Sequence, residues 1–106
     1  MTTPEGRIKA KFNKRIKEIQ ARYPGRLFVR MPVTRGMGKP LLDYLFCANG
    51  KFIAVEAKRD ENHKITPQQK ATMAEINNAM GMVFCVCDEG TIDCVATIID
   101  KLCAYP

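Results

Sequence analysis

The sequence lacks the long hydrophobic run that a membrane-spanning helix requires, since no apolar stretch approaches roughly 18 residues. The N-terminal residues carry charges with no apolar segment behind them, so we expect no secretory signal peptide. The sequence also lacks a CxxC pair or a cluster of cysteine with histidine. Its five cysteines are an odd number without zinc-site spacing, which argues against a disulfide framework or a structural zinc site. These absences favour an intracellular globular protein.

A chain of 106 residues has the length of one domain, and we expect residues 1–106 to form a single domain. The 17 basic and 11 acidic residues give a net charge of +6. The excess lies at the N-terminal end, where residues 1–30 hold nine basic and two acidic groups, whereas the remainder holds eight and nine. Such a cationic region suits a polyanion such as nucleic acid, although a solvated helix face with a basic bias gives the same composition.

The hydrophobic spacing predicts seven elements in the order α, β, β, β, α, β, α. Helices are predicted from Thr3-Pro4 to just before Pro24, from Thr66-Pro67 to near Gly81, and over residues 92–102. Strands are predicted at 26–33, 41–48, 51–58 and 82–87, with a turn at 88–90. The strands are apolar on both faces, which indicates an α/β fold with a sheet between helices.

A two-residue hairpin turn is predicted at Asn49-Gly50, and it fixes the pairing of the flanking strands. Asp43 then lies opposite Glu56, and Lys58 projects from the same face. Two facing carboxylates on an apolar hairpin repel each other. Either a salt bridge to Lys58 or a divalent cation would relieve this repulsion, and a pair of carboxylates suits Mg²⁺. A one-residue slip in register would place Asp43 on the other face.

Two further polar residues share a helix face with core residues. Glu5 precedes Ile8 by three on the first apolar stripe, so it is either a site residue or a first-turn carboxylate that stabilises the helix end. Gln69 lies on the core-facing stripe of the second predicted helix. An amide both donates and accepts hydrogen bonds. Gln69 can therefore form a capping box with Thr66 and reach the site at the same time.

Several of these features together resemble a known nuclease family. Asp43, the thirteen-residue step to Glu56 and the run Glu56-Ala57-Lys58 resemble the core of PD-(D/E)XK nucleases. With Pro4-Glu5-Gly6 before them and Thr66-Pro67-Gln68-Gln69 after them, the chain is similar to a stand-alone VRR-NUC domain, the virus-type replication-repair nuclease branch common in phages. The family usually has a proline directly before the aspartate, where this chain has Leu42.

The resemblance implies a PD-(D/E)XK core, in which helices flank a central mixed sheet, and a metal-dependent DNA endonuclease activity. In that family the equivalents of Asp43, Glu56, the Ala57 carbonyl and Glu5 bind Mg²⁺ or Mn²⁺. Lys58 would orient or activate the attacking water, and Gln69 would support the site. The resemblance also implies a homodimer that cuts branched DNA such as Holliday junctions, in DNA replication, repair or recombination in the cytoplasm of a bacterium or phage-infected host.

Candidate DNA-binding residues lie on the basic helix and in the segment after the first strand. They are Arg7, Lys11, Lys14, Arg15, Arg35 and Lys39. A plain connector is the alternative interpretation of residues 34–40. For the whole chain, the alternatives are a non-catalytic nucleic-acid-binding module on the same fold and a structural subunit. The facing carboxylates favour the nuclease, because acids beside a phosphate-binding surface repel the ligand of a pure binder.

Overall fold

The computed structural model describes residues 3–33 and 41–105. Its helices and strands follow the predicted order, and they are α1 (Pro4–Arg22), β1 (Leu27–Arg30), β2 (Tyr44–Ala48), β3 (Lys51–Ala57), α2 (Pro67–Asn78), β4 (Met82–Val86) and α3 (Glu89–Ala104). The segment 34–40, with the candidates Arg35 and Lys39, lies outside the described residues. None of the described helices is long and apolar enough to cross a membrane.

The four strands form one mixed sheet in the order β1-β2-β3-β4. The first three strands are antiparallel neighbours, whereas β4 pairs parallel with β3 after the crossover through α2. This topology confirms the predicted α/β fold with a mixed central sheet.

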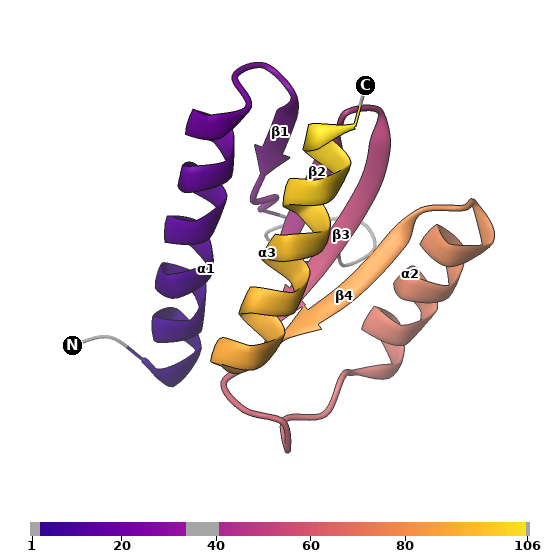
Figure 1. Ribbon diagram of the computed structural model, residues 1–106. Helices are drawn as coiled ribbons and strands as arrows, with labels where there is room; N and C mark the ends of the chain where they lie inside the picture. Colours follow the sequence, from indigo (N-terminus) through magenta and orange to yellow (C-terminus); the bar gives the residue numbers. More distant parts are fainter. Residues whose placement is uncertain (1–2, 34–40, 106) are drawn as a thin grey trace.

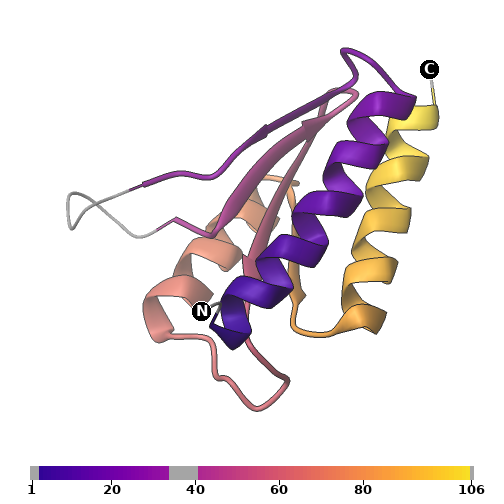
Figure 2. The same ribbon diagram turned by 90° about the vertical axis from the view of Figure 1, so that its left-hand side faces the viewer.

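The two faces of the sheet are covered differently. Helices α1 and α3 lie side by side over one face (Figure 1), and α2 lies on the opposite side near β3 and β4 (Figure 2). The apolar stripe of α1, formed by Ile8, Phe12, Ile16 and Ile19, is buried against the sheet. On the other face Phe28, Cys47 and Phe52 pair across three strands, and all three are exposed. Helices therefore enclose the sheet fully on one face and partly on the other.

Several predicted boundaries were wrong, and three of them have a clear physical reason. The first strand ends at Arg30 rather than residue 33, since Pro32 has no N–H to give to a sheet. The second begins at Tyr44 rather than Leu41, because the amide of Asp43 donates to a side chain instead of the partner backbone. The predicted turn at 88–90 is the start of α3, where the Asp88 side chain caps the helix by accepting from the Thr91 amide.

Candidate active site

The hairpin places Asp43 and Glu56 together at one end of the sheet. Asn49 and Gly50 have φ values of 50° and 89°, as a two-residue turn of this kind requires. The register that follows pairs Tyr44 with Val55, so Asp43 lies one step beyond, level with Glu56. The Asp43 amide donates to Glu56 Oε1 at 3.1 Å. The predicted pairing is therefore confirmed back to Tyr44 at the start of β2, and beyond it the Asp43 amide contacts the Glu56 side chain.

Asp43 is also tied to the next residue of β3. Its Oδ2 atom accepts a hydrogen bond from the Ala57 amide at 2.9 Å. In an extended strand the carbonyl and the N–H of one residue point to the same side, so the Ala57 carbonyl is on the side of β3 that faces β2. Two carboxylates and this backbone carbonyl thus belong to the same end of the β2–β3 hairpin.

Glu56 and Lys58 are the buried charged residues among those that the structure describes, with exposed fractions of 4% and 8%. Glu56 lies near the end of β3, and the Lys58 amide holds the chain to β4 by donating to the Val86 carbonyl at 2.9 Å. Lys58 Nζ lies 3.4 Å from Glu56 Oε2. A buried charge is costly unless it is paired, so each of these side chains depends on the other.

Gln69 connects α2 to this pair. Its Oε1 accepts from the Thr66 amide at 3.0 Å and from Lys58 Nζ at 3.2 Å, while its Nε2 donates to Glu56 Oε2. The Thr66 hydroxyl accepts from the Gln69 amide at 3.2 Å, which completes a capping box. The structure therefore places Gln69 both in the cap of α2 and in contact with the site.

Burial and the nearby charge of Asp43 raise the pKa of Glu56 from its ordinary 4.5 to about 7, and the Lys58 ammonium opposes this shift. Burial is the larger of the two causes, and the Lys58 ammonium offsets only part of the shift. A cation bound between Asp43 and Glu56 would favour the charged form of both groups.

Glu5 reaches the site only through a residue that the sequence analysis did not select. Lys9 Nζ lies 3.5 Å from Glu5 Oε2 and 3.5 Å from Asp43 Oδ1, so it bridges the two acids. No direct contact joins Glu5 to Asp43 or Glu56 within the described residues. The spacing of four between Glu5 and Lys9 was a visible signal for their pair, but not for the reach of Lys9 to Asp43.

The donor set at the hairpin end fits a small, hard divalent cation. Mg²⁺ is commonly held by one or two carboxylates, with water and substrate oxygens completing its shell. Asp43, Glu56 and the Ala57 carbonyl supply donors of this kind. The described residues contain no group of three histidine, cysteine or acidic side chains arranged for a metal. The candidate ligands are therefore these two carboxylates and one carbonyl, with Glu5 outside their contact.

The candidate DNA-binding residues of α1 fall into two groups. Lys11 Nζ lies 3.0 Å from Glu89 Oε1, and Arg15 Nη1 lies 2.9 Å from Asp93 Oδ1, so α3 carboxylates match both charges. Arg7 and Lys14 form no ion pair with another described residue. Arg7 and Lys14 are therefore the stronger candidates for phosphate contacts from this helix.

Comparison with solved structures gives a match to one described as a "VRR_NUC domain". The match has a TM-score of 0.60 at 25% sequence identity, and it covers 82% of this chain and 95% of the matched chain. This chain has the VRR-NUC fold. No family model matches the sequence, and no curated protein matches it closely. The likeness to a VRR-NUC domain confirms the family resemblance drawn from Asp43 and the run Glu56-Ala57-Lys58.

Proposed function

We propose that the protein is a metal-dependent nuclease that hydrolyses phosphodiester bonds in DNA. The observation that carries this proposal is the buried cluster of Asp43, Glu56, Lys58 and Gln69 at the end of the hairpin. The fold shared with a VRR-NUC domain supports it. A cluster that raises a carboxyl pKa and buries an ammonium is costly for a structural subunit, and perturbed groups of this kind concentrate at functional sites.

Asp43, Glu56 and the Ala57 carbonyl would hold Mg²⁺ or Mn²⁺. When bound, the ion would supply Lewis-acid polarisation of the phosphate and a lower pKa for water. Lys58 holds its ammonium beside Glu56 Oε2, where it can orient the attacking water and offset negative charge on the phosphate. Gln69 fixes the position of Lys58 and Glu56, and Lys9 holds Asp43 in the same way. Glu5 acts on the site through Lys9, as a positioning residue.

The substrate that we propose is branched DNA such as a Holliday junction, processed during DNA replication, repair or recombination in a bacterium or an infecting phage. The family resemblance and the positive charge of +6 support this proposal. Arg7 and Lys14 would contact phosphates without reading sequence.

A homodimer is part of the same proposal, because two copies of the site would cut two strands. The exposed row Phe28, Cys47 and Phe52 on the open sheet face is an apolar surface that a second subunit would cover. Light scattering of the purified protein tests this point. A mass of two chains that falls to one in Phe52→Glu supports the dimer, and a single-chain mass in the wild type contradicts it.

The nuclease proposal is tested by cleavage of a labelled four-way junction and a matched linear duplex, with Mg²⁺, Mn²⁺ or EDTA. The wild type is compared with Lys58→Ala and with Lys101→Ala, which changes an exposed lysine of α3. We expect metal-dependent cutting of the junction by the wild type and Lys101→Ala, and a loss on the order of 10²-fold or more in Lys58→Ala.

Each other outcome of this assay has a defined meaning. Equal cutting of junction and duplex would leave the nuclease and remove the junction preference. Tight, metal-independent binding without cutting in any metal would contradict catalysis and identify a nucleic-acid-binding module.

A further inference from the structure

The ammonium group of Lys9 contacts two carboxylates from different parts of the fold. Its Nζ atom lies 3.5 Å from Glu5 Oε2, one turn earlier on α1, and 3.5 Å from Asp43 Oδ1 at the end of the hairpin. The side chains of Lys9 and Asp43 are only 28% and 25% exposed, so water screens this contact in part. Lys9 therefore places a positive charge at the edge of the candidate active site.

Packing between α1 and β2 fixes the position of Lys9. Tyr44, which directly follows Asp43, is fully buried, and its ring meets the Phe12 ring edge-on with the ring centres 5.1 Å apart. The Tyr44 hydroxyl donates to Asn13 Oδ1 at 2.7 Å. Phe12 and Asn13 follow Lys9 by about one helical turn, so these contacts hold the same part of the helix against the start of β2. The contact between Lys9 and Asp43 thus follows from the way that α1 crosses the sheet.

Each carboxylate of the candidate metal site has its own lysine. Lys58 Nζ lies 3.4 Å from Glu56 Oε2, just as Lys9 Nζ lies beside Asp43 Oδ1. A carboxylate oxygen has two lone pairs, so Asp43 and Glu56 can bind an ion while both lysines stay in place. Glu5 differs, because its contact with Asp43 runs through Lys9. A second ion shared by Glu5 and Asp43 would need the two oxygens that contact the Lys9 ammonium, which would repel it.

The charge of this cluster also suits one divalent ion. Its three carboxylates, when ionised, contact the two ammonium groups of Lys9 and Lys58, so one net negative charge remains. One divalent ion converts this into one positive charge, which matches a single phosphodiester group. A second ion would raise the excess to three positive charges in a partly buried cluster, where unpaired charge is costly.

We propose that the Lys9 ammonium occupies the position between Glu5 and Asp43 that a second metal ion would need, so that the site binds one divalent ion through Asp43 and Glu56. The proposal rests on the nuclease function above and deepens it, because it gives the number of ions that the site binds. Lys9 is a positioning residue in this role, since it acts through Asp43. Glu5 holds Lys9 in place and does not bind the ion.

A titration with Mn²⁺ counts the ions directly, because the electron paramagnetic resonance signal of free Mn²⁺ gives the bound number at each addition, up to millimolar free ion. The test variant is Lys9→Met, and the matched control is Lys17→Met, which removes an exposed lysine from the same helix. We expect one bound ion per chain in the wild type and in Lys17→Met. We expect two in Lys9→Met, because Glu5 and Asp43 can then share a second ion.

Two further variants separate the charge of Lys9 from its packing. Lys9→Arg keeps the positive charge and should bind one ion. Lys9→Met combined with Glu5→Gln removes a ligand of the second ion, so the number should return to one. Circular dichroism checks that each variant is folded.

One bound ion in Lys9→Met, or two in the wild type, would overturn the proposal. A wild type that cuts DNA with two bound ions would overturn the role of Lys9 alone and leave the nuclease. One ion in the wild type and two in Lys9→Met, without any cutting of DNA, would support the role of Lys9 and contradict the nuclease. A wild type that binds no Mn²⁺ would contradict both.

Discussion

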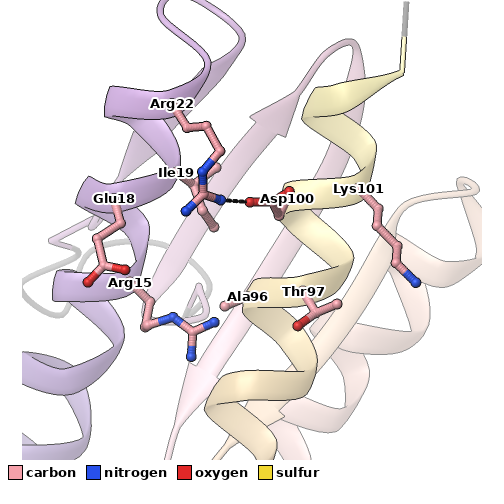
Figure 3. Close-up of a pocket in the computed structure, with 8 residues that line it drawn as sticks. All are labelled: Arg15, Glu18, Ile19, Arg22, Ala96, Thr97, Asp100 and Lys101. Atoms are coloured by element: carbon pink, nitrogen blue, oxygen red, sulfur yellow. Dashed lines mark hydrogen bonds and ion pairs between the residues drawn. The ribbon is translucent and has the colours of Figure 1, made fainter.

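Two sets of charged residues in this protein contain the same chemical groups but differ in burial. The site cluster, formed by Asp43, Glu56, Lys58 and Gln69, lies at the end of the hairpin. The interhelix ladder consists of three ion pairs between α1 and α3, each joining positions 78 apart, and these are Lys11–Glu89, Arg15–Asp93 and Arg22–Asp100. Figure 3 shows the Arg22–Asp100 pair between the two helices.

Exposure decides what each set can do. The side chains of Lys58 and Glu56 are 11% and 5% exposed, whereas those of Lys11 and Glu89 are 53% and 82% exposed. Water and salt screen the ladder, so each of its pairs contributes little to stability. In the cluster, removal of one partner leaves an uncompensated buried charge. The ladder therefore resembles an ordinary solvated surface, while the cluster has a stability cost that a catalytic role explains.

The largest difference is expected when a lysine is removed from each set. Lys58→Met should lower the free energy of unfolding by about 3 kcal/mol at pH 8 in EDTA, since the buried Glu56 must then either stay charged without its partner or bind a proton. Lys11→Met makes the same chemical change in the ladder and should cost less than about 1 kcal/mol. Urea denaturation measures both values. Similar losses in the two variants would show that burial does not separate the two sets.

The pH dependence of stability sharpens the comparison. The pKa of Glu56 is about 7 in the folded protein against an ordinary 4.5, so the folded state binds more protons between these values. The stability from this group is therefore full below pH 4.5 and is lost as the pH rises through about 7. In EDTA the wild type should lose several degrees of Tm between pH 5 and pH 8, and Glu56→Gln should lose less. Equal pH slopes for the two proteins would contradict the raised pKa.

The neighbouring glutamines of α2 test how the cluster is held. Gln69→Ala removes the capping box and the contacts to Glu56 and Lys58, so it should cost about 1 kcal/mol of stability. It should also slow cleavage on the order of tenfold. Gln68→Ala, at an exposed position one residue away, should change neither stability nor cleavage beyond experimental error. Thermal unfolding and the cleavage rate are measured for both, and a similar effect in the two variants would remove Gln69 from the site.

The smallest effect is expected within the ladder. A double-mutant cycle of Arg15→Ala and Asp93→Ala should give a coupling free energy of about 0.5 kcal/mol, because the pair is exposed. The coupling should fall toward zero as NaCl is raised to 1 M, where the Debye length is about 3 Å. A coupling that is several times larger, or independent of salt, would mean that the ladder locks the two helices together.

The sequence was sufficient for the parts of the fold and site that depend on local rules. The Asn49-Gly50 turn has one short geometry, so it determined that Asp43 faces Glu56. The capping box at Thr66 fixed the start of α2 and hence the position of Gln69. The start of α3 was missed because its cap, Asp88 with Thr91, lacks the usual acidic or amide partner at the third helical position.

Contacts between distant elements could not be read in the same way. Lys9 reaches Asp43 because of how α1 crosses the sheet, and no periodicity encodes that distance. The pairing of Lys11 with Glu89 and of Arg15 with Asp93 depends on the alignment of two helices 78 positions apart. For this reason the basic N-terminal segment suggested a uniform DNA-binding face, whereas the structure pairs Lys11 and Arg15 with carboxylates of α3.

The central claim is that Asp43 and Glu56 together bind a divalent metal, and a calorimetric titration with Mn²⁺ tests it directly. We expect the wild type to bind Mn²⁺ and Asp43→Asn to lose detectable binding, because the substitution removes one of two charged ligands while an oxygen remains to accept from the Ala57 amide. Glu5→Gln, which contacts the site through Lys9, should retain binding. Wild-type Mn²⁺ affinity in Asp43→Asn, or no binding by the wild type, would contradict the metal site.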